Sequence, residues 1–218
     1  MKKIVKKFDI YDFDELNDDI KEKVIKRIRE DEIDSYCEFY LYDDMLEKCQ
    51  DLVFEKFGIK NADLEIHYDL SYTQGSGAMF EMSLYMDDIN KKYNFLTDEE
   101  LRFVKDYTDT KIIIHHNNGH YYNQFCFLID YNYYNYHDYD EIKDDYGLTE
   151  GDFYDIDEKI NIFLNRKNTF YNDIIDINNK LTEFGYNSIE RFYKDDVIKD
   201  IIYNRELKFY KDGSSFNG

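Results

Sequence analysis

The chain has 218 residues, 43% of them hydrophobic, which suffices for one large domain or two small ones with a real core. Its formal net charge is −20, from 48 acidic and 28 basic side chains. Such an excess disfavours direct contact with nucleic acid or anionic membranes and favours basic partners. The 23 tyrosines and 17 phenylalanines argue against disorder, because disordered chains are poor in aromatic residues.

The chain opens with MKKIVKKF, and no apolar run follows it, so we expect neither a signal peptide nor a membrane-spanning segment. The three cysteines show no pairing pattern. Cys37 and Cys49, if they share a helix, would lie about 18 Å apart, which is too far for a disulfide. We therefore expect a reducing cytoplasm as the compartment.

The first quarter of the chain is predicted to be mainly helical. Residues Lys3 to Ile10 fit a short strand, and Asp14 is placed to cap a helix that runs to about Glu30. A second helix is predicted over residues 36–57, where Gly58 is well placed to end it.

The middle of the chain alternates between apolar and polar residues, as strands do. Residues 64–72 alternate, and the pattern resumes at 78–86, so Gln74 to Gly77 predicts a tight hairpin connection. Thr97 and Glu100 form a capping box that opens a short helix. Residues 111–116 and 121–130 then predict a second hairpin across Asn117, Asn118 and Gly119.

The last third returns to helical spacing. One helix is predicted over residues 153–184 and ends at Gly185, another begins at Asn187 or Ser188, and residues 206–210 predict a closing strand. The sequence thus favours one α+β domain over residues 1–218, with an antiparallel sheet of four to six strands covered by helices and a helical C-terminal half. Two sub-lobes, 1–130 and 131–218, remain an alternative.

The histidines cluster in the run HHNNGH. With Asn118 and Gly119 as a two-residue turn, His115 and His120 share one face of the hairpin and His116 lies on the other, so the three do not converge. The cysteines have no metal-ligand spacing either. We therefore expect no metal and no cofactor.

The run SYTQGSG resembles a phosphate-binding loop only superficially. It has no Gly-Lys-Ser/Thr, and strand residues follow it rather than a helix, so a hairpin turn is the favoured interpretation. No serine has a G-x-S-x-G context. We therefore predict a protein that is not an enzyme, and keep as an alternative a small enzyme that uses the Gln74–Gly77 turn with His115 and His120.

The acidity is concentrated in one region. Residues 130–158 hold eleven carboxylates and one lysine, a net charge of −10 and half of the total. If helical, this segment carries one net charge every ~4.4 Å, similar to the ~3.4 Å phosphate spacing of a DNA strand. Its tyrosines suit stacking on arginine side chains. A solvated acidic face that only promotes solubility stays open as the alternative.

Three passages together resemble a family of uncharacterised proteins encoded by bacteriophages and mobile elements. SYTQGSGAMF at 71–80 resembles the family's S-Y-S-Q-G-D-G-A-x-F motif, and residues 189–213 and 11–25 resemble its end and its start. Ser76 stands where the family usually has Asp, which weakens a metal or catalytic role there. The resemblance implies a phage-related origin but no particular activity.

Phage origin and acidity together suggest an anti-CRISPR or anti-restriction protein that binds a basic, nucleic-acid-binding surface of a bacterial defence effector, as a DNA or RNA mimic. An antitoxin-like partner of a basic toxin would use the same surface. The expected partner is a basic protein, with no direct nucleic acid and no membrane. The residues predicted to bind it are Tyr134, Tyr136, Asp138, Tyr139, Asp140, Glu141, Asp144, Asp145, Asp152 and Asp155.

Overall fold

The computed structural model describes residues 8–60, 62–107, 111–117, 122, 127–131, 149–165 and 168–216. Helices and one antiparallel sheet make up the fold, with four strands in the order β1-β2-β3-β4, which confirms the predicted α+β class. The chain divides into two compact units, Met1–Tyr42 with Tyr186–Gly218, and Asp43–Gly185. Among the described helices, every one is too short or too polar to cross a membrane.

The first unit is helical. Its elements are η1 (Phe13–Glu15), α1 (Asp18–Phe39), η3 (Arg191–Tyr193) and α8 (Asp195–Asn204). Val24 and Ile28 of α1 are buried, as are Ile198 and Ile202 of α8, because each pair recurs at the four-residue spacing that places side chains on one helix face. In place of the predicted closing strand, Phe209 makes isolated bridges only, with Tyr11 and Ser215.

The helices at the start of the chain have other bounds than the sequence predicts. Asn17 rather than Asp14 is the N-cap of α1, and α1 continues through the expected gap at residues 31–35, which contain neither glycine nor proline. The break falls instead at Tyr40, after which α2 covers Leu41–Phe57. Gly58 ends α2 as predicted, with a φ of 73° and its N–H bonded to the Phe54 carbonyl at 2.8 Å.

The sheet belongs to the second unit. Its strands are β1 (Leu64–Asp69), β2 (Gly77–Tyr85), β3 (Lys111–His116) and β4 (Phe127–Tyr131). Ile66, Phe80, Met82, Ile112 and Ile114 are buried and lie on one face, as the pairing Ile66↔Phe80 and Met82↔Ile114 requires. The alternation read from the sequence is therefore confirmed for these strands.

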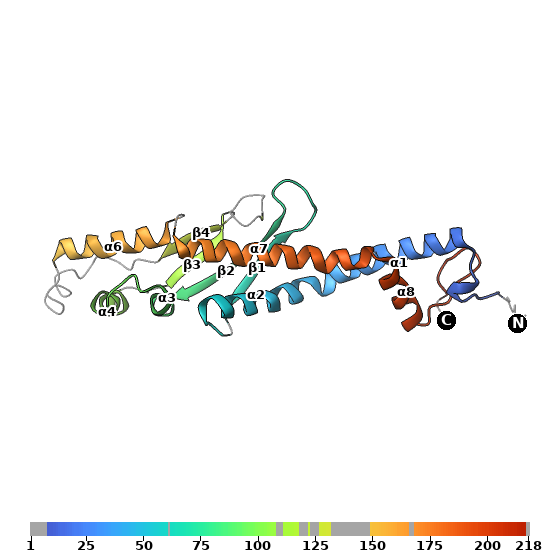
Figure 1. Ribbon diagram of the computed structural model, residues 1–218, viewed down its shortest axis with the longest axis horizontal. Coiled ribbons are helices and arrows are strands. Elements are labelled where there is room, and N and C mark those ends of the chain that lie inside the picture. Colours follow the sequence, from blue (N-terminus) through green and yellow to red (C-terminus); the bar gives the residue numbers. More distant parts are fainter. Residues whose placement is uncertain are drawn as a thin grey trace, which may run out of the picture. The chain divides into compact units, whose positions relative to one another are not determined.

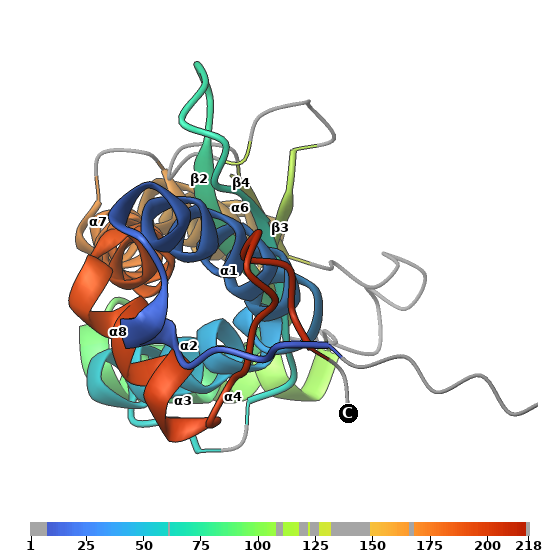
Figure 2. The ribbon, with the colours of Figure 1, turned by 90° about the vertical axis from the view of Figure 1, so that its right-hand side faces the viewer.

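Both hairpin connections, from β1 to β2 and from β3 to β4, are longer than predicted. The predicted turn does occur at residues 74–75, where the Ser76 N–H bonds the Thr73 carbonyl at 3.1 Å, but it lies within a loop of residues 70–76 that extends beyond the ends of β1 and β2 (Figures 1 and 2). In the second hairpin His115 pairs with Leu128, not with Tyr122, and His116 pairs with Phe127. The strand register that a two-residue turn at Asn118 and Gly119 would impose is thus wrong, because His115 pairs six residues further on, and these two residues themselves lie outside the described ones.

The helices of the second unit are α2, described above, α3 (Met86–Tyr93), α4 (Asp98–Tyr107), α6 (Glu150–Leu164) and α7 (Thr169–Glu190). The first two residues of α2 and the last five residues of α7 fall in the first unit. The single helix predicted over 153–184 is therefore two helices. The chain turns between them where the Asn168 N–H bonds the Asn165 carbonyl at 3.0 Å. Asparagine suits such a turn, because its short polar side chain competes with helical hydrogen bonds.

Helix α7 lies along the sheet (Figure 1) and completes the hydrogen bonding of β2. Strand β3 pairs with β2 only at residues 82–85. Beyond that point the N–H of Ala78 donates to Thr182 Oγ1 at 2.8 Å, and the N–H of Phe80 donates to Asn178 Oδ1 at 3.3 Å. Asn178 is fully buried, so this bond satisfies two groups that would otherwise be costly to bury.

Gly185 lies inside α7 and does not end a helix, so the predicted helix end there is wrong, as is the predicted helix start at Asn187 or Ser188. A Cβ at this position would come within 2.7 Å of Leu70 Cδ1 and 3.3 Å of Met45 Sδ. The glycine therefore permits close packing of α7 against these two side chains.

Candidate functional site: an acidic pocket between two helices

Most of the residues predicted to bind a partner lie outside the described residues, and for these the prediction stays a prediction. They are Tyr134, Tyr136, Asp138, Tyr139, Asp140, Glu141, Asp144 and Asp145. The structure does describe Asp152 and Asp155, both on α6.

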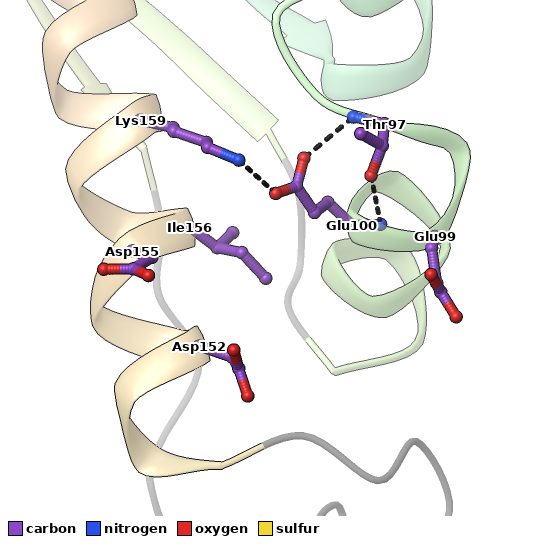
Figure 3. Close-up of a pocket in the computed structure, with 7 residues that line it drawn as sticks. All are labelled: Thr97, Glu99, Glu100, Asp152, Asp155, Ile156 and Lys159. Carbon is purple, nitrogen blue, oxygen red and sulfur yellow. Dashed lines mark hydrogen bonds and ion pairs between the residues drawn. The ribbon is translucent and has the colours of Figure 1, made fainter.

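Asp152 and Asp155 line a pocket of about 340 Å³ between α4 and α6 (Figure 3). The remaining lining residues are Thr97, Glu99, Glu100, Ile156 and Lys159. In Figure 3 Asp152, Ile156 and Lys159 point from α6 toward α4, whereas the carboxylate of Asp155 is turned away from α4. The pocket thus joins residues about fifty positions apart in the sequence.

Both helices begin at this pocket with a capping box. The Glu100 N–H donates to Thr97 Oγ1 at 3.2 Å, and the Thr97 N–H donates to Glu100 Oε2 at 2.8 Å, as the sequence predicts. On α6, the backbone N–H and the hydroxyl of Thr149 both donate to Asp152 Oδ2 at 2.7 Å. These bonds hold the pKa of Asp152 below its usual value, so the carboxylate is ionised at neutral pH.

Glu100 differs from the other carboxylates of the pocket because it is ion-paired. Its partner is the ammonium group of Lys159, and the glutamate side chain is 18% exposed. Burial acts to raise the pKa of Glu100, but the hydrogen bonds from Lys159 and Thr97 outweigh burial and leave it lowered. The same contact raises the pKa of Lys159. The pair is therefore charged on both sides at neutral pH.

The pocket as a whole carries excess negative charge. Among the residues that the structure describes, four acidic residues and one lysine line it, and Glu99 and Asp155 are exposed. Carboxylates accept hydrogen bonds and pair with lysine and arginine, best in a bidentate manner with arginine. From the sequence, Glu100 was predicted only as a capping residue, and Glu99 was given no role. Their position in the acidic first turn of a predicted helix was visible, but the packing of α4 against α6 was not.

The alternative site, at the glycine turn and the histidines, is only partly described. His115 Nε2 lies 2.6 Å from Asp130 Oδ2, and His120 falls outside the described residues. The structure does bring the two segments together, because the Tyr122 N–H donates to the Gly75 carbonyl at 3.0 Å. His116 stacks on the ring of Tyr122, with ring centroids 4.9 Å apart.

His67, for which the sequence predicted no functional role, also stacks with His116 and Tyr122. The ring of His67 lies 5.4 Å from that of His116, and its Nε2 lies 3.1 Å from Glu81 Oε1 and 3.8 Å from Glu65 Oε1. Glu65, His67 and Glu81 are the one group of three potential metal ligands found among the described residues. The alternation of β1 places Glu65 and His67 on one face, but Glu81 joins them only through the register of β1 with β2.

Comparison with known proteins adds no further information on the site. No protein-family model, curated protein or solved structure matches this chain.

Proposed function

We propose that this protein is a phage-encoded inhibitor that acts in the host cytoplasm by binding a basic, nucleic-acid-binding surface of a bacterial defence effector, such as a CRISPR or restriction nuclease. The observation that carries the proposal is the concentration of acidic residues from two helices, α4 and α6, around one pocket whose described lining includes a single lysine. The net charge of −20 supports it. A basic groove evolved for phosphates would be attracted to such a surface over several ångströms.

The pocket belongs to a larger acidic region. Asp152 and Asp155 are the C-terminal part of the stretch 130–158, which carries a net charge of −10. Glu99 adds an exposed carboxylate from a separate helix. The described part of the proposed binding surface therefore joins α6 to the start of α4, and the rest of the acidic stretch lies outside the described residues. Antitoxin-like binding of a basic toxin would use the same chemistry, and the identity of the captured partner separates the two.

The test is affinity capture from nuclease-treated bacterial lysate with wild type and two matched double variants. Glu99→Gln/Asp155→Asn removes two exposed charges at the pocket but leaves both capping boxes and the Glu100 ion pair in place. Asp31→Asn/Glu38→Gln removes two exposed charges from α1 and has the same effect on net charge.

We expect wild type and the α1 variant to capture one nucleic-acid-binding protein, which heparin and high salt release. The pocket variant should capture about tenfold less of it, since one or two lost charge pairs correspond to roughly 1.4 kcal/mol. Equal loss in both variants would show that net charge alone drives binding. Capture of a protein that does not bind nucleic acid would contradict the proposed target class.

A further inference from the structure

The carboxylates Glu65 and Glu81 face each other directly on the outer face of the sheet. They are a register pair of β1 and β2, and His67 follows two residues along β1, on the same face. Like charges directly opposite each other destabilise a strand pair unless a positive group lies between them. No lysine or arginine is paired with either carboxylate among the described residues.

His67 presents its Nε2 to both carboxylates without hydrogen bonding to either. The nitrogen is buried and makes no hydrogen bond to any residue that the structure describes, although Oε1 of Glu81 lies 3.1 Å away. A buried ring nitrogen without a partner is costly. A cation placed between the nitrogen and the two oxygens would satisfy all three groups.

We propose that Glu65, His67 and Glu81 bind a divalent transition-metal ion of the Zn²⁺ type. Their ligand atoms lie within 4.8 Å of one another. Metal bonds of about 2.0–2.2 Å place two ligand atoms at most ~4.4 Å apart, so the 3.1 Å and 3.8 Å separations already suit a shared ion. The imidazole favours Zn²⁺ and its neighbours over Mg²⁺ and Ca²⁺, which prefer oxygen ligands alone.

The neighbouring groups hold these ligands in place. The backbone N–H of His116 donates to Glu81 Oε1 at 2.6 Å, and the rings of His116 and Tyr122 stack with that of His67. Such contacts fix the orientation of metal ligands and raise affinity. Glu65 is 66% exposed at its side chain, so the ion would keep a coordination position open to water or to a further ligand.

The experiment is calorimetric titration of the full chain with Zn²⁺, with thermal unfolding measured in parallel. We expect one ion per chain with a Kd of about 10 µM or tighter, and a Zn²⁺-dependent rise in Tm. His67→Ala, Glu81→Gln and Glu65→Gln should each weaken this event by about tenfold or more. Co²⁺ in place of Zn²⁺ should give visible absorption bands that His67→Ala abolishes.

His115→Ala is the matched control, because His115 also sits beside a carboxylate, Asp130, but outside the cluster. It should keep both the affinity and the Tm shift. The Glu65→Gln variant should fold normally, because this side chain is exposed and its replacement leaves the core intact. A loss of metal binding in this variant could therefore not be attributed to misfolding. The proposal fails if wild type shows only weak, unsaturable binding to its many carboxylates, or if His115→Ala loses the ion while His67→Ala retains it.

Discussion

Two groups of carboxylates in the second unit have opposite surroundings. Asp173 of α7 accepts hydrogen bonds from Lys56 at 3.2 Å, Lys92 at 2.9 Å and the Tyr93 hydroxyl at 2.6 Å, and its side chain is only 17% exposed. The described lining of the pocket has four acidic residues and one lysine, and that lysine is ion-paired with Glu100 alone among them. A carboxylate that is ion-paired within the chain, such as Asp173, stabilises the packing of helices. A carboxylate without a lysine or arginine partner in the described structure can instead attract a basic partner protein. Acidic content alone, as seen in the sequence, does not distinguish these two roles.

Replacing Asp173 should have the largest effect on stability. Asp173→Asn removes the charge that two ammonium groups and a phenol share, and it keeps the side chain's size. We expect a loss of about 2 kcal/mol in the free energy of unfolding, measured by urea titration. Asp176→Asn is the control, since Asp176 contacts Lys56 and Lys180 but is 40% exposed, and should lose about 0.5–1 kcal/mol. Equal losses of stability in the two variants would contradict the idea that the buried, multiply bonded Asp173 matters more than the exposed Asp176.

The stabilising effect of Asp173 should also disappear in acid. Burial acts to raise its pKa, but the hydrogen bonds from Tyr93, Lys92 and Lys56 outweigh burial and lower it. A carboxyl whose pKa is lower in the folded than in the unfolded state stabilises the fold above the unfolded value, and this contribution is lost as pH falls through the folded value. The gap between wild type and Asp173→Asn should therefore narrow between about pH 5 and pH 2. A constant gap would contradict this assignment.

Local signals in the sequence predicted the local structure well. The capping box of Thr97 and Glu100, the helix end at Gly58 and the alternating strands are confirmed, because each depends on residues within a few positions of one another. Gly185 shows where prediction from local signals fails. Its role is contact with Leu70 and Met45, which lie far away in the sequence, so a rule about helix ends gave the wrong answer.

The candidate site was predictable only in part, for the same reason. Asp152 and Asp155 follow from the charge of the region, but their association with Glu99 depends on how α4 packs against α6. The cluster of Glu65, His67 and Glu81 depends on the register across a seven-residue loop, which turn chemistry does not fix. Tertiary packing and register are the two properties that a single sequence leaves open.

Removing Lys159, the one lysine in the described lining of the pocket, should sharpen the contrast between the Asp173 cluster and the pocket carboxylates. Lys159→Gln leaves Glu100 without its ammonium partner, and because Lys159 is 48% exposed we expect a loss of at most about 1 kcal/mol in stability. The described lining of the pocket then carries negative charge only, so binding of the proposed basic partner should tighten and become more salt-dependent. Titrations of wild type and Lys159→Gln with the captured partner at two salt concentrations measure the affinity and its salt dependence. Weaker binding would show that Lys159 itself contacts the partner.

The smallest expected effect on stability is that of Glu99→Gln/Asp155→Asn, the variant expected to weaken partner binding. Both side chains are exposed, and neither takes part in a capping box. Glu99 loses a few tenths of a kcal/mol of favourable interaction with the N-terminus of α4, and the relief of repulsion within the pocket offsets that loss. The free energy of unfolding should therefore stay within about 0.5 kcal/mol of wild type.

Urea titration beside the α1 control, Asp31→Asn/Glu38→Gln, measures this difference directly. A loss above about 1 kcal/mol confined to the pocket variant would place Glu99 and Asp155 among the structural carboxylates with Asp173. If the pocket variant keeps its stability but captures less partner, Glu99 and Asp155 contribute to binding and not to folding. Their charges would then serve contact with another molecule.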